Sequence, residues 1–100
     1  MPPPGPQRDP LDERLQARDL SVRYAALDAL REKASPRVMA RAAAPLLADP
    51  DPGLRERASR LLATLSAPER AAQEVAPYIT HADITTRNLA GEVLVALDAP

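Results

Sequence analysis

Residues 49–65 read DPDPGLRERASRLLATL, and the spacing within this stretch recurs on both sides of it. Asp51 and Arg55 stand four residues apart, and Ala58, Leu62 and Leu65 follow at a helical spacing. The same pattern recurs 32 residues earlier and 32 residues later, without gaps. The repeated positions are Asp19, Asp51 and Asp83; Arg23, Arg55 and Arg87; Ala26, Ala58 and Ala90; and Leu30, Leu62 and Leu94. In-phase columns of aspartate and arginine are not a by-product of an alanine-rich composition, so the sequence indicates an internal repeat.

The composition favours a single all-helical domain. The chain has 100 residues, enough for one domain with a thin hydrophobic core. Hydrophobic residues make up 45% of it but aromatic residues only 2%, so the core must be built from Leu, Ala, Val and Ile. Tyr24 and Tyr78 are the only aromatic side chains. Because sheets favour β-branched and aromatic residues, this composition suits closely packed helices better than a sandwich.

Charge and cysteine content narrow the range of functions. The formal net charge is -1, without the basic excess that is typical of a nucleic-acid-binding protein. The chain has no cysteine, which excludes disulfides, zinc–thiolate sites and thiol catalysis. No apolar run approaches the roughly 18 residues of a membrane-spanning helix. The first residues also lack the apolar segment of a signal peptide. We therefore expect a soluble, cytoplasmic protein that does not bind a membrane.

Each 32-residue period predicts two helices. The first begins at Pro36 or Pro68, because proline is well tolerated at the first helical position, and runs to about residue 48 or 80. Pro45 and Pro77 fall inside this helix, and an interior proline predicts a kink or break. The second helix begins after the aspartate of each period, which is a good N-cap, and runs to about residue 33, 65 or 97.

The domain boundaries follow from these helices. Residues 1–9 form a proline-rich leader that we expect to be disordered, and residues 10–100 form the repeat domain. The predicted repeats cover about residues 10–34, 35–66 and 67–98. The first repeat lacks most of its opening helix, for which Asp9 and Pro10 predict only a short helix over residues 10–17.

Paired helices, a period near 32 residues and the motif D-x-x-x-R-x-x-A-x-x-x-L resemble the HEAT-repeat family. The closest variety is the short bacterial, PBS-lyase-like HEAT repeat, and the resemblance covers residues 10–98. It implies an α-solenoid of about three helix pairs, whose second helices line a concave face. Such repeats serve scaffolds, adaptors, regulators, chromophore lyases and a few DNA-repair enzymes. Thr86 stands where the pattern has an apolar residue and Gly91 lies mid-helix, so we expect the third repeat to be the loosest.

The most regular polar feature is a ladder of repeated charges. Its members are Asp19, Arg23, Asp51, Arg55, Asp83 and Arg87. A stack of identical turns brings these groups close together, and the guanidinium fork suits carboxylates. We interpret the ladder as structural, with each aspartate capping a helix and each arginine bridging to an aspartate of its own or the neighbouring repeat. The alternative is a charged ladder that contacts a ligand.

The side chains that open onto the implied concave face are candidate protein-binding residues. They are Tyr24, Leu27, Asp28, Arg31, Glu56, Arg60, Asn88 and Glu92. This face is mixed in charge and lacks the aligned cations that a phosphate backbone needs and the aromatic platforms that stack bases. It suits a protein or peptide, with Tyr24 and Leu27 as central anchors. An ordinary solvated surface is the alternative.

The sequence shows no catalytic constellation. It contains no glycine-rich phosphate loop and no GxSxG elbow. His81 is the only histidine, and without cysteine it cannot form a convincing metal site, so we expect it to be solvated or to cap a helix end. No cofactor is expected.

The predicted function is therefore that of a non-catalytic adaptor or scaffold that binds another protein or peptide. Two alternatives remain, a chromophore-lyase-like subunit, which would need a bilin pocket, and a HEAT-like nucleic-acid-binding module. The last helix carries Val93, Val95 and Leu97. Because terminal repeats normally need a polar cap, we expect this C-terminal end to meet a second copy, a different protein or further repeats.

Overall fold

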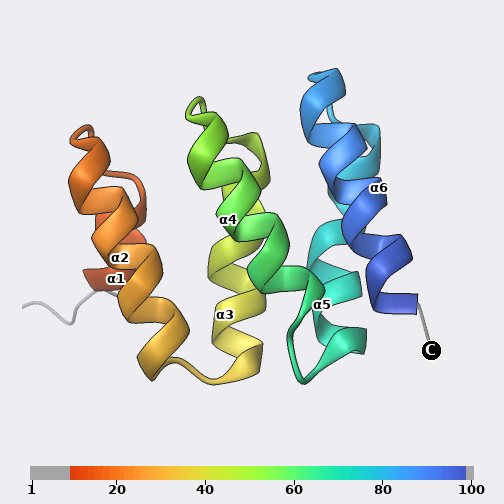
Figure 1. Ribbon diagram of the computed structural model, residues 1–100, viewed down its shortest axis with the longest axis horizontal. Coiled ribbons are helices and arrows are strands. Elements are labelled where there is room, and N and C mark those ends of the chain that lie inside the picture. Colours follow the sequence, from red (N-terminus) through yellow and green to blue (C-terminus); the bar gives the residue numbers. More distant parts are fainter. Residues whose placement is uncertain (1–9, 99–100) are drawn as a thin grey trace, which may run out of the picture.

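The computed structural model describes residues 10–98, and side chains from residue 13 onward (Figure 1). The predicted leader over residues 1–9 lies outside the described residues. The elements are α1 (Pro10–Leu15), α2 (Leu20–Lys33), α3 (Pro36–Ala43), the 3₁₀ helix η1 (Ala44–Ala48), α4 (Pro52–Ala63), α5 (Pro68–Val75), the 3₁₀ helix η2 (Ala76–Thr80) and α6 (Ile84–Asp98). No strand occurs in this described part of the chain, so the prediction of an all-helical domain is confirmed.

The helices form three neighbouring pairs. Figure 1 shows α2, α4 and α6 side by side on one side of the molecule, with α1, α3 and α5 on the other. Along the first side α4 packs against both α2 and α6, and on the second side α3 packs against α5. The molecule measures 49 × 25 × 24 Å, and its long axis crosses the helix pairs. The second and third pairs therefore contact each other through both of their helices, and the first pair packs on the second through α2.

The first helix of each complete period breaks where proline predicts it. The N–H of Ala44 still bonds to the carbonyl of Ala40, but Pro45 has no N–H to continue the series. The chain tightens from there into η1. The third period repeats this change, with α5 passing into η2 around Pro77. The predicted break is confirmed in both periods.

The repeated aspartates begin the second helices, as predicted. Asp19 accepts a hydrogen bond from the backbone N–H of Ser21 at 2.9 Å, and Asp51 accepts one from Leu54 at 2.9 Å. Asp83 accepts the N–H of Thr85 at 3.0 Å. These bonds satisfy amide groups that have no partner within the first helical turn.

The repeated apolar residues build one core that runs through all three pairs. Ala26, Ala58 and Ala90 are at most 1% exposed, and their small side chains let neighbouring helices approach closely. Leu30 and Leu62, one turn later, are fully buried. The helical spacing that predicted the helices thus also identifies the face that each second helix turns toward the core.

The sequence led us to expect that Thr86 would loosen the third repeat, but the structure gives this residue a buried, hydrogen-bonded position. Its side chain is fully buried, and its hydroxyl donates a hydrogen bond of 2.9 Å to the carbonyl of Leu47 in η1. A hydroxyl in this column therefore joins the second and third repeats at a carbonyl that an apolar side chain would leave unpaired. The third repeat is more exposed at one equivalent position. Ile79 in η2, which corresponds to Leu47 in η1, is 47% exposed, whereas Leu47 is fully buried.

The repeated arginines hold the loops that join the paired helices. The Arg55 guanidinium donates to the carbonyls of Asp49 and Pro50, at 2.8 and 3.3 Å. Arg23 and Arg87 bond to the carbonyls five and six residues before them in the same way. Within the described residues no repeated arginine forms an ion pair with a repeated aspartate. The predicted pairing of the repeated arginines with the repeated aspartates is therefore wrong, because those aspartates accept helix amides and the guanidinium groups reach the loop carbonyls. In this part of the chain Arg23 alone meets an aspartate of the neighbouring repeat, Asp49, at 3.4 Å.

Replacing Arg55 with Ala should lower the free energy of unfolding by about 1–2 kcal/mol, because two loop carbonyls lose a charged donor. Urea denaturation of the purified variant measures this change. Arg41→Ala is the matched control, since Arg41 is exposed on α3 and should change stability by less than about 0.5 kcal/mol. Equal stability of the Arg55 variant and the wild type would contradict the structural role of the clamp.

Replacing Gly91 with Ala should raise the free energy of unfolding by about 0.5–1 kcal/mol. Gly91 lies inside α6, where glycine is unfavourable, and an added Cβ would meet no other atom within 4 Å. Gly53→Ala should have the opposite effect, because a Cβ there would overlap the Tyr24 hydroxyl. Thermal melts of both variants test the pair. Tyr24→Phe in the Gly53→Ala background should recover part of the loss, and no recovery would argue against this overlap as the cause.

Candidate functional site

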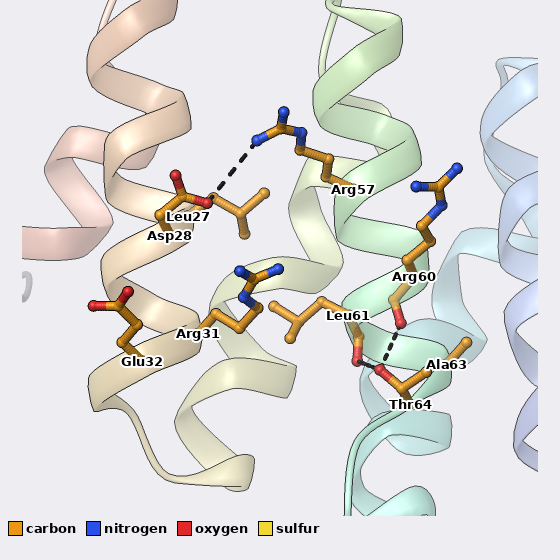
Figure 2. Close-up of a pocket in the computed structure, with 9 residues that line it drawn as sticks. All are labelled: Leu27, Asp28, Arg31, Glu32, Arg57, Arg60, Leu61, Ala63 and Thr64. Carbon is orange, nitrogen blue, oxygen red and sulfur yellow. Dashed lines mark hydrogen bonds and ion pairs between the residues drawn. The ribbon is translucent and has the colours of Figure 1, made fainter.

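Two grooves lie between the second helices. The larger encloses about 800 Å³ between α2 and α4 (Figure 2). The smaller encloses about 450 Å³ between α4 and α6. We call them the α2–α4 groove and the α4–α6 groove. Since α4 borders both, its two flanks contribute to different grooves. The two grooves together occupy the side of the molecule that the sequence singled out for binding.

The α2–α4 groove combines an apolar floor with charged walls. It is lined by Leu27, Asp28, Arg31, Glu32, Arg57, Arg60, Leu61, Ala63 and Thr64. Figure 2 shows Leu27 and Leu61 between the two helices, while Arg31 from α2 and Arg57 from α4 extend into the space between them. In the same view Glu32 and Arg60 point away from the middle of the groove. The centre of the groove therefore presents two guanidinium groups over leucine side chains.

Arg57 is partly held by α2. Its guanidinium carbon lies 4.7 Å from the centroid of the Tyr24 ring, a cation–π distance, and its Nη1 lies 3.9 Å from Asp28 Oδ1. Both side chains of that ion pair are 56% exposed, so the pair contributes little to stability. Arg57 is thus oriented by an aromatic face and only loosely neutralised by a carboxylate.

Arg31 and Arg60 differ in how their charge is compensated. Arg60 donates to Glu56 Oε1 at 2.6 Å, one helical turn earlier on α4. Arg31 has no hydrogen bond or ion pair to any residue that the structure describes, and its side chain is exposed. Arg31 therefore contributes to the α2–α4 groove a positive charge that is not held in an ion pair.

The α4–α6 groove has a different charge pattern. It is lined by Pro52, Arg55, Glu56, Ser59, Arg60, Thr85, Leu89 and Glu92. Arg55 is already engaged with the loop carbonyls and Arg60 with Glu56. Glu92 on α6 is exposed and is left without a cationic partner among the described residues. The lining of this groove therefore has a formal charge of zero, whereas that of the α2–α4 groove is +1.

Six of the eight predicted binding residues line these grooves. Leu27, Asp28 and Arg31 line the α2–α4 groove, Glu56 and Glu92 line the α4–α6 groove, and Arg60 borders both. Tyr24 and Asn88 line neither groove.

Neither proposed anchor is free. Tyr24 is half-buried, stacks beneath Arg57 and donates a hydrogen bond of 2.7 Å to Asp51. Leu27 is only 4% exposed and belongs mainly to the core. Both residues join helix pairs to one another, so the idea that they act as exposed anchors does not fit their surroundings.

Comparing equivalent positions of the three repeats did not identify Arg57 and Leu61 as binding residues. Equivalent positions lie on the same flank of every second helix, whereas a groove is bordered by opposite flanks of two neighbouring helices. The right spacing was present in the sequence, since Arg57, Leu61 and Thr64 follow one another at helical intervals of three or four residues. Nothing in the sequence alone, however, tells which flank of α4 faces α2.

His81 plays a local role at the start of the last turn before α6. Its Nδ1 accepts the backbone N–H of Asp83 at 3.0 Å, and its ring stacks on Tyr78 with centroids 6.2 Å apart. This bond holds the turn before α6 and does not cap a helical amide, because α6 begins only at Ile84. In a neutral ring, accepting at Nδ1 leaves the proton on Nε2. Residues 10–98 contain no group of three or more His, Asp or Glu side chains arranged to hold a metal ion.

Comparison with protein-family models, with curated proteins and with solved structures found no match to this chain. Among the described helices, none combines the length and the apolar character needed to cross a membrane.

The hydrogen bond between Tyr24 and Asp51 predicts a stability that depends on pH. Together with the Leu54 N–H, the Tyr24 hydroxyl lowers the pKa of Asp51 below its ordinary value of 3.8. The stabilisation is therefore complete above about pH 4 and is lost as the pH falls through the lowered pKa of the folded state. The same bond raises the pKa of Tyr24 above 10.0, so its contribution is lost again as the pH rises through that higher value.

Tyr24→Phe should reduce the acid-dependent loss of stability, because it removes the largest cause of the lowered Asp51 pKa. Urea denaturation between about pH 7 and pH 2.5 measures the loss in both proteins. Tyr78→Phe is the matched control, since the Tyr78 hydroxyl makes no hydrogen bond within the described residues. This variant should lose as much stability at low pH as the wild type. An equal loss of unfolding free energy at low pH in the wild type and in the Tyr24 variant would contradict the role given to the Tyr24–Asp51 hydrogen bond.

Proposed function

We propose that the chain is a HEAT-like α-solenoid that acts as a non-catalytic protein- or peptide-binding module, an adaptor or scaffold. The observation that carries the proposal is the position of the two grooves. Both are bordered by the second helices, which the HEAT resemblance assigns to a concave binding face, and together they take in six of the eight residues named from the sequence.

The contrast between frame and surface supports this proposal. The polar groups that hold the fold are occupied, since the repeated aspartates accept helix amides and the repeated arginines bind loop carbonyls. The groove residues Asp28, Arg31 and Glu92 are exposed and make at most a long ion pair. Side chains of this kind are available to a partner, and the frame beneath them does not have to rearrange.

The proposed mechanism is rigid presentation. A surface that keeps its shape before and after binding loses little conformational entropy, which leaves more of the contact energy for affinity. The partner would be another protein or a peptide, and copies of the chain or further repeats are the proposed neighbours at the C-terminal end.

A photo-crosslinking amino acid placed at Asp28 or Glu92 should capture a partner protein in extract of the producing cells. Asp28 stands on α2 and Glu92 on α6, and both are exposed. The same amino acid at Arg37 or Arg41, which are exposed on α3, is the matched control. The expected result is one captured protein, identified by mass spectrometry, from the groove positions and not from α3. Products of equal yield at all four positions, or none at any of them, would rule out a specific binding side.

A further inference from the structure

We propose that the α2–α4 groove binds an acidic peptide segment, with a ligand carboxylate between Arg31 and Arg57 and an apolar ligand side chain on Leu27 and Leu61. This inference rests on the proposed function and states the chemistry of the partner. Its first support is the balance of charge inside the groove. Arg31 is unpaired, and the one carboxylate that Arg57 contacts among the described residues is Asp28, at 3.9 Å. The lining as a whole has three arginines and two carboxylates, a formal charge of +1, in a chain whose net charge is -1.

The geometry suits an anion with a planar pair of oxygen acceptors, such as a carboxylate. Arg31 and Arg57 reach into the groove from opposite walls, and each planar guanidinium offers two parallel N–H donors. A carboxylate between them would accept from both sides. Displacing Asp28 costs little, because that pair is long and more than half exposed on both side chains.

The floor adds a preference for a peptide over a free ion. In Figure 2 the Leu27 side chain lies between the two guanidinium groups, and the Leu61 side chain lies beside Arg31. Only the edge of Leu27 is exposed, and Leu61 is half-buried, so the floor can take one aliphatic side chain but cannot anchor a whole hydrophobic helix. A space of about 800 Å³ likewise suits a short segment rather than a folded domain.

Nucleic acid fits the same groove less well. Backbone binding draws on several aligned cations, whereas here Arg60 is turned away and paired with Glu56. The one aromatic ring beside the groove, Tyr24, is covered by Arg57 and cannot stack a base. The neighbouring α4–α6 groove carries Glu92, which would repel a phosphate backbone that continued across α4.

Fluorescence anisotropy at low ionic strength tests the inference with a labelled peptide, Gly-Glu-Glu-Leu-Glu-Glu-Gly, and the full chain. The wild type should bind this peptide saturably. Arg31→Glu should weaken binding about tenfold or more, because a charged donor is replaced by a repelling carboxylate. Arg31→Lys should weaken it several-fold, since the charge remains but the fork is lost. A peptide with Gln in place of each Glu should lose binding to a similar degree.

Arg41→Glu is the matched control, because it makes the same change of charge at an exposed position on α3. It should leave the affinity within about threefold of the wild type. Thermal melts of both Glu variants show whether they are folded, and the Gln peptide tests the carboxylate with the wild-type chain in any case. Equal losses for Arg31→Glu and Arg41→Glu would reveal general attraction and overturn the proposal. So would absence of peptide binding, or tighter, Arg31-dependent binding of a labelled single-stranded oligonucleotide.

The crosslinking experiment and the peptide-binding experiment test the two proposals independently of each other. Crosslinks confined to the groove positions without peptide binding would retain the adaptor function and reject the acidic ligand. Arg31-dependent peptide binding without a crosslinked protein would retain the ligand chemistry and reject the adaptor function.

Discussion

The structure depends on the way the loop between paired helices is held. In the second repeat the Asp51 carboxylate accepts an amide of the first helical turn, and the Arg55 guanidinium donates to two carbonyls of the preceding loop. The four-residue spacing places both side chains on one face of α4, so the arginine can reach back over the turn. Donors and acceptors of the loop are thereby satisfied within one repeat. Arg23 and Arg87 bind the carbonyls of their own preceding loops in the same way, so the same contact recurs in all three repeats.

The contacts between repeats, by contrast, differ from one junction to the next. The first junction uses an ion pair of 3.4 Å between Arg23 and Asp49 and the hydrogen bond between Tyr24 and Asp51. The second uses the Thr86 hydroxyl on a carbonyl of η1. His81 stands at the position of Asp49 and, like it, accepts the N–H two residues on. A neutral ring keeps that local bond but offers no carboxylate to the arginine of the preceding repeat.

The sequence could predict what is decided within one or two helical turns. Helix starts at aspartate or proline and the breaks near Pro45 and Pro77 depend on neighbouring backbone groups, and these predictions are confirmed. The hydrogen-bond partners of long side chains such as arginine could not be predicted in this way. The spacing places Arg55 near an aspartate, yet it does not show that the carboxylate is already used by an amide. From the sequence alone, Gly53 would be expected only to weaken its helix. In the structure the Tyr24 hydroxyl packs against it and leaves no room for a Cβ.

The candidate site was harder to predict than the fold because it is formed by differences between repeats. Arg31, Ala63 and Val95 occupy one column of the repeat and present a cation, a methyl group and an apolar side chain that is 73% exposed. Changes in such a column leave the loop clamps and helix caps untouched, so the surface can vary while the frame stays constant. A groove then joins one flank of a helix to the opposite flank of its neighbour. The charge that a partner meets is therefore set by the packing of two unequal repeats, which the shared motif of those repeats does not contain.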